Sequence, residues 1–505
     1  MYSSRFVGSV RSSGRTAGQV LAVLALIVLG LVPLSQPAQA TVWAEPGDMQ
    51  LRSDIELLAA ARMVDGITMT WPLPWSDLVD RLKKADLRNR SPHVVNAAAR
   101  VLNRAVREGS AGLHYGATVT ATDRPSVVRG YDGMSRGDAQ GQVFGEVIGD
   151  RFNVRLAIGA EVDHGWDRAR IKPDGSFAAV AVGGLVAYAG YRDHWWGPGR
   201  ISALAVSTNA RPIPQVGFAR RFTHPSEHWL LSWMGPWQFE FFVGLLDDER
   251  IVNDTWYNAF RLTMNPFPGF EFGITRTQMF CGDGRKCNPV VDYFDVNNSQ
   301  SNTNRTNDQL VFDFKYSTMI RETGLSIYSQ IMNEDSSPIK KSYSTYLVGG
   351  TVWAPLAGQQ VRLTAEYTDS VPTAHLFSFG YRQYGLTYNN GDYLDGTRYR
   401  GRTMGFSLDS DSRLATLQAS LVDDRAWVWQ LTLNQAQISS GPLSRSPRFT
   451  NIVSSEPVRI YLGEARVTIP WTNYTFDIAG RLQDDQPRPQ KGFAASIEGG
   501  IQVRF

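Results

Sequence analysis

The chain ends in the stretch Ala494-Ala-Ser-Ile-Glu-Gly-Gly-Ile-Gln-Val-Arg-Phe505, which alternates between two kinds of side chain up to its last residue. One face of the predicted strand carries Ala495, Ile497, Gly499, Ile501, Val503 and Phe505, and the other carries Ser496, Glu498, Gly500, Gln502 and Arg504. Because successive side chains of a strand point to opposite faces, this pattern predicts a strand with one apolar and one water-facing side. Strands of this kind occur both in soluble β-sandwiches and in membrane barrels.

The terminal aromatic residue favours the membrane barrel. A final strand that ends on an aromatic such as Phe505 resembles the C-terminal signal by which bacterial outer-membrane barrels are recognised for insertion. We therefore expect the barrel-assembly machinery to be a partner during insertion, and outer-membrane lipid to surround the protein afterwards.

Residues 1–40 predict a secretory signal peptide. An arginine-containing start precedes an apolar run from Val20 to Leu34, and the small residues Ala38 and Ala40 form a cleavage site. A transmembrane helix needs roughly 20 apolar residues, and this run is shorter and is interrupted by a glycine and a proline. We expect cleavage near Ala40 and a final location in the bacterial outer membrane.

The composition agrees with a barrel. The 505 residues include 24 Phe, 19 Tyr and 14 Trp, yet the mean hydropathy is only −0.25. Lipid-facing apolar residues that alternate with polar lumen residues produce this combination. The formal net charge of +3 is small for this length, so nothing in it favours nucleic acid as a partner.

Residues 41–112 differ from the rest, because their pattern is helical. The sequence Ser53-Asp-Ile-Glu56 has the spacing of a capping box and predicts a helix that begins there. A second helix is expected near Ser76, and a third after Ser91, with Pro92 at its first position. Such a small bundle is marginal as a free domain, so we expect it to pack against another surface.

Residues 113–505 show a period of two. In Phe152–Val162, apolar residues alternate with others, and Arg155 and Glu161 lie on the non-apolar face. Similar segments recur at 238–246, 307–316, 324–332, 345–353, 360–368, 414–422, 427–435, 464–471 and 474–482. Tight turns alternate with long polar connections such as 282–305 and 387–400. At the usual strand lengths this region predicts an all-β transmembrane antiparallel barrel of about 18 strands.

The two cysteines and the histidines give no sign of a metal or catalytic site. Cys281 and Cys287 enclose a short loop, and in an oxidising compartment they predict a disulfide. The seven histidines are scattered without the spacing of metal ligands, and no serine-hydrolase signature occurs. We expect no cofactor, no metal and no catalytic residue.

A family resemblance comes from the stretch Tyr191-Arg-Asp-His-Trp-Trp-Gly-Pro-Gly-Arg200 and the nearby Asn209-Ala-Arg-Pro212. Together with Leu51-Arg-Ser-Asp-Ile55 and Trp71-Pro-Leu-Pro-Trp75, these pieces resemble the Wzi family of outer-membrane capsule-assembly proteins. The resemblance covers the helical region, this central motif and the barrel pattern, but not the loops.

The resemblance implies an 18-stranded barrel whose N-terminal helical bundle closes the periplasmic end. The implied role is lectin-like and non-catalytic: holding capsular polysaccharide or exopolysaccharide at the cell surface. A sugar-conducting porin, whose lumen has to be open, is the alternative, and an outer-membrane hydrolase is a more distant one.

The role of the central motif stays open at the level of sequence. Four strands counted from the plug to Tyr191 place it toward the periplasmic end or the lumen. One interpretation is that Trp195 and Trp196 pack on the plug while Arg200 and Arg211 pair with acids in the lumen; the other is that the tryptophans stack on glycan. The plug and lumen set is Asp193, His194, Trp195, Trp196, Arg200, Asn209 and Arg211.

Sugar contacts are expected in the long loops, because amides and carboxylates bind hydroxyl groups and tyrosine rings cover the apolar face of a sugar. The richest stretch supplies Tyr388, Asn389, Asp392, Tyr393, Asp395 and Tyr399. The competing interpretation is that these are ordinary turn and membrane-interface residues.

Overall fold

The computed structural model describes residues 43–162, 171–247, 249–285, 287, 306–334, 343–441 and 451–505. The predicted signal peptide lies outside these residues. Among the described residues, no helix is both long enough and apolar enough to cross a bilayer.

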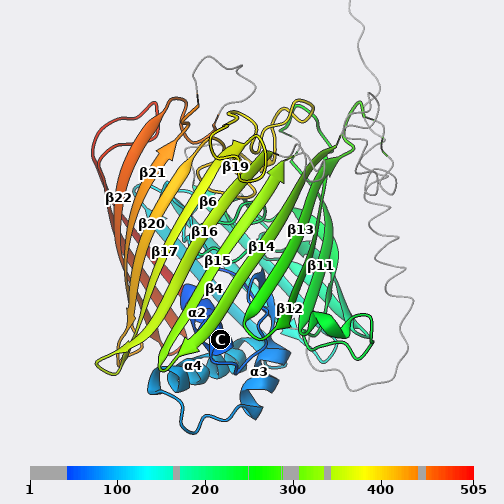
Figure 1. The fold of residues 1–505 in the computed structure, drawn as a ribbon, viewed down its shortest axis with the longest axis vertical. Coiled ribbons are helices and arrows are strands. Elements are labelled where there is room, and N and C mark those ends of the chain that lie inside the picture. The colour runs from blue at the N-terminus through cyan, green and yellow to red at the C-terminus, as the bar shows by residue number, and fades with distance from the viewer. Residues whose placement is uncertain are drawn as a thin grey trace, which may run out of the picture.

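The main structure is a closed barrel of 18 antiparallel strands, as the sequence pattern predicts. Figure 1 shows the strands inclined around a wide lumen. In chain order they are β4 (Gly112–Thr122), β5 (Ala139–Ile148), β6 (Phe152–Val162), β7 (Phe177–Val182), β8 (Leu185–Tyr191), β10 (Pro214–Arg220), β11 (Trp237–Leu245), β12 (Trp256–Phe267), β13 (Phe270–Phe280), β14 (Asn307–Ile320), β15 (Thr323–Glu334), β16 (Tyr343–Leu356), β17 (Gln359–Thr373), β20 (Arg413–Val422), β21 (Val428–Ile438), β22 (Val458–Trp471), β23 (Tyr474–Gln483) and β24 (Ala494–Arg504). Each strand pairs with its neighbour, and β24 closes the barrel on β4.

The alternation along each strand decides which side chains face outward. On β6, Leu156, Ile158 and Val162 are 71%, 55% and 60% exposed, whereas Asn153 and Ala157 on the opposite face are buried. A belt of exposed apolar side chains around a barrel is unfavourable in water and favourable in lipid. Buried polar residues, by contrast, dominate the inner side of the wall.

The two ends of the barrel differ. At one end, seven of the eight strand connections have two to five residues, and we call this the short-turn end. At the other, the long-loop end, the nine connections have 8 to 39 residues. Figure 1 shows the helices and the C-terminus at the short-turn end.

The helical region contains α2 (Met49–Ala60), α3 (Trp75–Lys84) and α4 (Pro92–Gly109), with the short strands β1 (Trp43–Ala44), β2 (Thr70–Trp71) and β3 (Leu73–Pro74). We call residues 43–110 the plug.

The capping-box prediction was wrong: α2 begins four residues before Ser53, and its N-cap is Asp48, whose side chain accepts a hydrogen bond from the Leu51 amide at 2.9 Å. Ser53 instead accepts from the Trp353 indole of β16 at 2.9 Å. Pro92 is the first residue of α4, as predicted.

The chain terminus completes the barrel seam. Phe505 exchanges two backbone hydrogen bonds with Tyr115, of 3.1 and 2.8 Å, and their rings stack with centroids 5.3 Å apart. The terminal residue therefore both extends the last strand pair and covers its outer side.

Deletion of Phe505 is expected to reduce the amount of folded barrel in the membrane several-fold, because the stack and the seam hydrogen bonds contribute on the order of 1–3 kcal/mol. Heat-modifiable mobility of membrane extracts on gels measures the folded fraction. Phe505→Trp, which keeps an aromatic end, should insert normally. Normal folded levels after the deletion would contradict the assigned role of Phe505.

Candidate functional site

The central motif lies on a loop that folds inward from the long-loop end. Residues 177–191 form two strands, β7 and β8, joined at Gly183 and Gly184, so five strands and not four separate the plug from the motif. The strand count made from sequence was therefore wrong by one. Gly183 has a φ of 59°, which suits a tight turn. The small apolar residues on both sides of this turn look like one continuous strand in the sequence. We call residues 192–213 the inward loop.

The inward loop reaches the plug through backbone pairing. Its short strand β9 (Trp195–Trp196) pairs with β2, with Trp195 opposite Trp71 and Trp196 opposite Thr70. Both tryptophans of β9 are 1% exposed. The ring of Tyr131 packs edge-on against Trp71 and Trp195, with centroids 5.4 Å apart in each pair. These tryptophans are therefore internal packing residues in this structure and offer no face to a ligand.

A buried ion cluster joins the plug, the inward loop and the barrel wall. Glu56 of α2 accepts from Arg52 at 3.1 Å and lies 3.0 Å from Lys315 of β14, and its other oxygen pairs with Arg200. Burial favours the neutral carboxyl, but the charges of Arg200, Lys315 and Arg52 outweigh it and hold the pKa of Glu56 well below its ordinary value. Three cations around one carboxylate make this position the main electrostatic link between the three parts.

Glu366 of β17 fixes the shape of the inward loop. Its carboxylate accepts from the backbone amides of Arg200 and Ser202, each at 2.8 Å, and from the Tyr328 hydroxyl at 3.0 Å. Backbone donors that converge on one carboxylate position a loop more firmly than a surface ion pair does. The barrel wall therefore determines where Arg200 meets the plug.

The remaining motif residues hold the inward loop to its surroundings. The pairs are Asp193 with Arg136 at 3.4 Å, Asn209 with the Thr403 carbonyl at 2.9 Å and Arg211 with Asp174 at 2.7 Å. His194 lies 3.1 Å from the side-chain oxygen of Gln215. Burial and the charge of Arg192 lower the pKa of His194 to about 3, so it is neutral at physiological pH. A buried neutral histidine with an amide partner is a packing residue.

A second loop covers the inward loop from the long-loop end. Residues 374–412, which we call the covering loop, connect β17 to β20 and contain β18 (Arg398–Tyr399) and β19 (Arg402–Thr403). The Tyr388 hydroxyl donates to the Leu204 carbonyl of the inward loop and accepts from the Phe406 amide at 3.1 Å. The lumen thus contains the plug, the inward loop and the covering loop in succession.

The tyrosines expected to contact sugar are not at the surface. Tyr388, Tyr393 and Tyr399 are 0%, 1% and 6% exposed, so no ring face is free to stack on a glycan. Composition alone did not reveal that this loop folds back into the lumen and uses its rings as a core. Asn389 accepts from Arg398 at 2.9 Å, and Asp395 accepts from the Ile251 amide at 2.7 Å. Asp392 is only partly exposed.

The exposed rings of the covering loop lie a few residues earlier. Phe377, Phe379 and Tyr381 are 61%, 54% and 75% exposed. The two phenylalanines pack on Tyr346 at centroid distances of 6.1 and 5.2 Å. We call Leu376, Phe377, Phe379 and Tyr381 the aromatic tip. The sequence could have indicated this exposed cluster, because three aromatic residues in five positions are unusual for a polar loop.

Cys281 and Cys287 form a disulfide at the long-loop end, directly after β13. The Tyr393 hydroxyl donates to the Cys281 carbonyl at 2.9 Å. The disulfide segment and the covering loop are therefore in direct contact.

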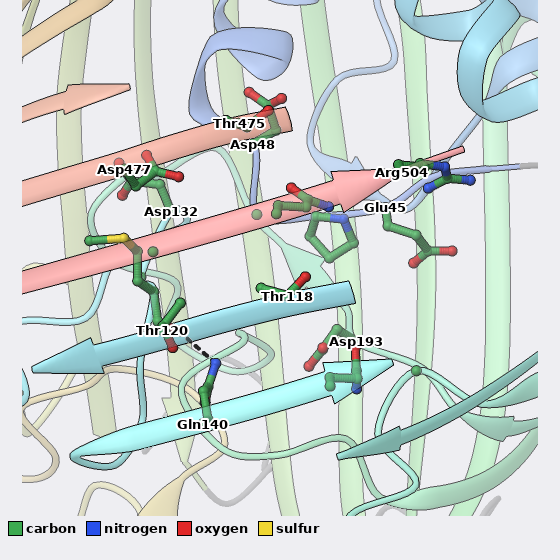
Figure 2. Close-up of a pocket in the computed structure, with 18 of the residues that line it drawn as sticks. Glu45, Asp48, Thr118, Thr120, Asp132, Gln140, Asp193, Thr475, Asp477 and Arg504 are labelled. Carbon is green, nitrogen blue, oxygen red and sulfur yellow. Dashed lines mark hydrogen bonds between the residues drawn. The ribbon is translucent and has the colours of Figure 1, made fainter. Parts of the chain in front are cut away.

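A polar cavity of about 430 Å³ lies between the plug, the inward loop and one side of the barrel wall. Figure 2 shows Thr118 and Thr120 of β4, Gln140 of β5, and Asp477 of β23 around it. Its size falls in the range of small-molecule sites, about 300–1,000 Å³. Its lining combines carboxylates and guanidinium groups with threonine hydroxyls and glutamine amides, which suits a polar ligand.

The charged groups of the cavity are largely paired with each other. Arg466 lies 3.2 Å from Asp132 and 3.1 Å from Asp477. Burial raises the pKa of Glu45 and of Asp193, against the opposing charges of Arg192 and Arg136. In the described part of the chain, no group of three or more His, Cys, Asp or Glu residues is placed to hold a metal ion. This arrangement can bind polar ligands.

Comparison with known proteins gives a family match. Residues 113–435 match the family model described as capsule assembly protein Wzi. A Klebsiella pneumoniae protein described as an uncharacterized 55.8 kDa protein in the cps region is 27% identical over 313 residues, and the match spans 60% of each chain. This share is below two thirds of the relative's length.

A solved structure shows the same fold. An Escherichia coli Wzi structure, described as an outer-membrane protein involved in group 1 capsule assembly and a carbohydrate-binding β-barrel, has a TM-score of 0.78 and 19% identity, over 93% of this chain and 100% of that one. The outer membrane protein OprD from Pseudomonas aeruginosa has a TM-score of 0.42 and 9% identity, over 78% of this chain and 93% of that one.

Proposed function

Because this chain belongs to the capsule assembly protein family Wzi, we propose that it is a bacterial outer-membrane barrel that binds surface polysaccharide and assists its assembly or attachment. The short-turn end faces the periplasm and the long-loop end faces the medium, in the usual orientation of such barrels. In this proposal residues 1–40 are the signal peptide, 41–112 are the helical region that contains the plug, and 113–505 form the barrel. The role is lectin-like and not enzymatic.

The observation that carries this proposal is the occupied lumen. An 18-stranded barrel is wide enough for an aqueous channel, yet here the plug, the inward loop and the covering loop fill it in succession. Buried ion pairs and backbone pairing hold these layers together. A protein built in this way suits retention of a polymer at the surface better than conduction of sugars.

The aromatic tip is the proposed contact surface for the polysaccharide. Its rings are exposed at the medium-facing end, and Ser378 and Arg382 supply hydrogen-bonding groups within the same segment. Aromatic faces cover the apolar side of sugars, and repeated weak contacts retain a polymer through multivalency. The partly exposed Asp392 is a second proposed contact, whereas the buried Tyr388, Tyr393 and Tyr399 shape the loop.

Replacement of Phe377, Phe379 and Tyr381 by serine should release polysaccharide from cells without lowering the unfolding temperature of the barrel. Loss of about 1 kcal/mol for each ring weakens a single site roughly fivefold per ring. Polysaccharide in the medium and on the cells measures the effect. Phe493→Ser, at another exposed ring of the long-loop end, is the matched control and should leave attachment unchanged. Normal attachment in the triple variant would refute the aromatic tip as the contact surface.

One observation favours the conducting alternative. A second cavity at the short-turn end is also about 430 Å³, and it shares Arg104, Glu108, Thr475, Gln502 and Arg504 with the cavity of Figure 2. The two together follow one side of the wall past the plug. Conductance of the intact protein in a planar bilayer distinguishes the two functions, because retention predicts little current and a porin predicts a robust one.

A further inference from the structure

The connection between β10 and β11 departs from the other connections of the short-turn end. It has 16 residues (221–236), against two to five in the other seven. It carries an exposed apolar patch formed by Trp229, Leu230, Leu231 and Trp233, whose side chains are 76%, 53%, 37% and 62% exposed. We call residues 228–234 the tryptophan segment. Its position is at the end opposite the proposed polysaccharide contacts.

Local hydrogen bonds give the tryptophan segment a defined shape. The amides of Leu231 and Ser232 both donate to the His228 carbonyl at 2.9 Å, and they lead into the short helix η1 (Ser232–Met234). The indole of Trp233 donates to the Leu230 carbonyl at 2.9 Å. Since its polar N–H is already bonded within the segment, the outer surface of the Trp233 ring is apolar.

Both ends of the connection are fixed to the rest of the molecule. Thr223 donates to Asp65 of the plug at 3.1 Å and, through its amide, to Asp77 of α3. At the other end, Gly235 has a φ of 62°, and a Cβ there would lie 2.1 Å from the Asn265 carbonyl oxygen of β12. The apolar patch is therefore presented by an anchored loop.

The patch continues the aromatic exterior of the neighbouring strands. Trp237 stacks on Phe239 of β11 at 5.9 Å, and Phe267 stacks on Phe270 at 4.6 Å at the turn between β12 and β13. Figure 1 shows the green helical turn of this connection beside the lower end of β12, to the side of the barrel and not beneath its mouth. Aromatic residues of a barrel gather at the two membrane–water interfaces.

The charge of the connection fits an anionic surface. Residues 220–236 contain two arginines and two histidines but one acidic residue, Glu227. The Arg220 guanidinium lies 4.0 Å from the Trp237 ring centroid, at the level of the aromatic residues. Tryptophan and leucine beside arginine is the composition of segments that lie in the headgroup region of a bilayer.

We propose that the tryptophan segment lies in the periplasmic leaflet of the outer membrane and anchors the short-turn end of the barrel to its phospholipids. Trp229, Leu230 and Trp233 enter the boundary between headgroups and acyl chains. The guanidinium of Arg220 is held by the Trp237 and His224 carbonyls, and its charge and that of Arg221 attract the phosphates at this level. The inference rests on the membrane location in the proposed function, but not on polysaccharide binding. The proposal assigns the phospholipids of this leaflet as the partner of the long connection at the short-turn end.

Leu230→Cys, labelled with an environment-sensitive fluorophore in the full barrel reconstituted in vesicles of phosphatidylethanolamine and phosphatidylglycerol, tests the proposal. Lipids with a nitroxide near the headgroup should quench the label strongly, and aqueous iodide should quench it weakly. The native disulfide leaves the new cysteine as the reactive thiol. Asp86→Cys in the plug, where the native side chain is 61% exposed, is the matched control and should show the reverse pattern.

A label at Leu230 that iodide reaches as readily as the label at Asp86, with no lipid quenching, would overturn the proposal. The patch would then be free to bind a periplasmic protein. Heat-modifiable mobility shows that each labelled barrel is folded, so a failure to fold is not confused with a water-exposed segment. If both labels are in water and the barrel fails to insert, the membrane location itself is wrong.

Discussion

Replacement of Glu56 by glutamine is expected to loosen the plug more than any other single change in α2. The change leaves Arg52, Arg200 and Lys315 buried around a neutral amide. Removing one partner from a buried ion cluster costs about 3–5 kcal/mol, because the remaining charges lose their compensation. Hydrogen exchange of the α2 amides should accelerate by more than about a hundredfold, since 1.36 kcal/mol corresponds to a factor of ten.

Two further variants make this test specific. Asp86→Asn removes an ion pair whose side chains are 88% and 61% exposed, and it should leave exchange in α2 unchanged. The double variant Glu56→Gln/Arg200→Met should recover part of the loss, because it also removes one uncompensated cation. Exchange at the wild-type rate in the single variant would contradict the role assigned to the cluster.

The ion cluster also determines how the plug responds to acid. The pKa of Glu56 is lower in the folded protein than its ordinary value of 4.5. Its contribution to stability is therefore complete above about pH 4.5 and is lost progressively as the pH falls from there toward the folded pKa. In the Glu56→Gln variant the plug should not lose stability in this way on acidification, because the ionised Glu56 carboxylate is already absent.

Removal of both the plug and the inward loop should convert the closed barrel into a conducting pore. Two of the three layers then leave the lumen, and the covering loop loses the Leu204 carbonyl that holds Tyr388. An 18-stranded barrel is wide enough for an aqueous channel, so conductance in planar bilayers should rise at least about tenfold. A variant that lacks residues 43–110 and has residues 195–211 replaced by a short glycine–serine connection tests this. Heat-modifiable mobility must show that the variant barrel is still folded.

The single deletion of residues 43–110 is the informative control. It removes β2 and the partners of Arg200, but Glu366 still holds the inward loop, and the covering loop still lies over it. We therefore expect a conductance between that of the intact protein and that of the double deletion. A large steady current from the intact protein would instead support the porin.

The barrel could be predicted from sequence because its physics is local. Alternation along a strand depends only on which face meets lipid, and the predicted segment Phe152–Val162 has the same bounds as β6. The strand count failed at residues 177–191, where a two-residue glycine turn interrupts a continuous apolar run. Alternation cannot reveal such a turn when the residues on both sides are small and apolar.

One interpretation of the central motif, that its tryptophans pack on the plug and its arginines pair with acids, agrees with the structure. Most other interior contacts could not be predicted, because they join distant residues. The Ser53 and Glu56 spacing fits a capping box, yet the structure uses Ser53 for the Trp353 indole and Glu56 for the ion cluster. Tyr388 and Tyr393 have the composition of a glycan-binding loop, but they are buried against residues of other loops. In both cases the deciding partners are more than 100 residues away in the chain.

The central claim is that this protein holds polysaccharide at the cell surface and does not conduct it. The most direct test is to measure polysaccharide on cells and in the medium for bacteria with and without the protein. We expect the total to be unchanged, with a larger share released into the medium in its absence and attachment restored by the intact gene. An unchanged attached share, or a fall in the total with nothing released, would contradict the account.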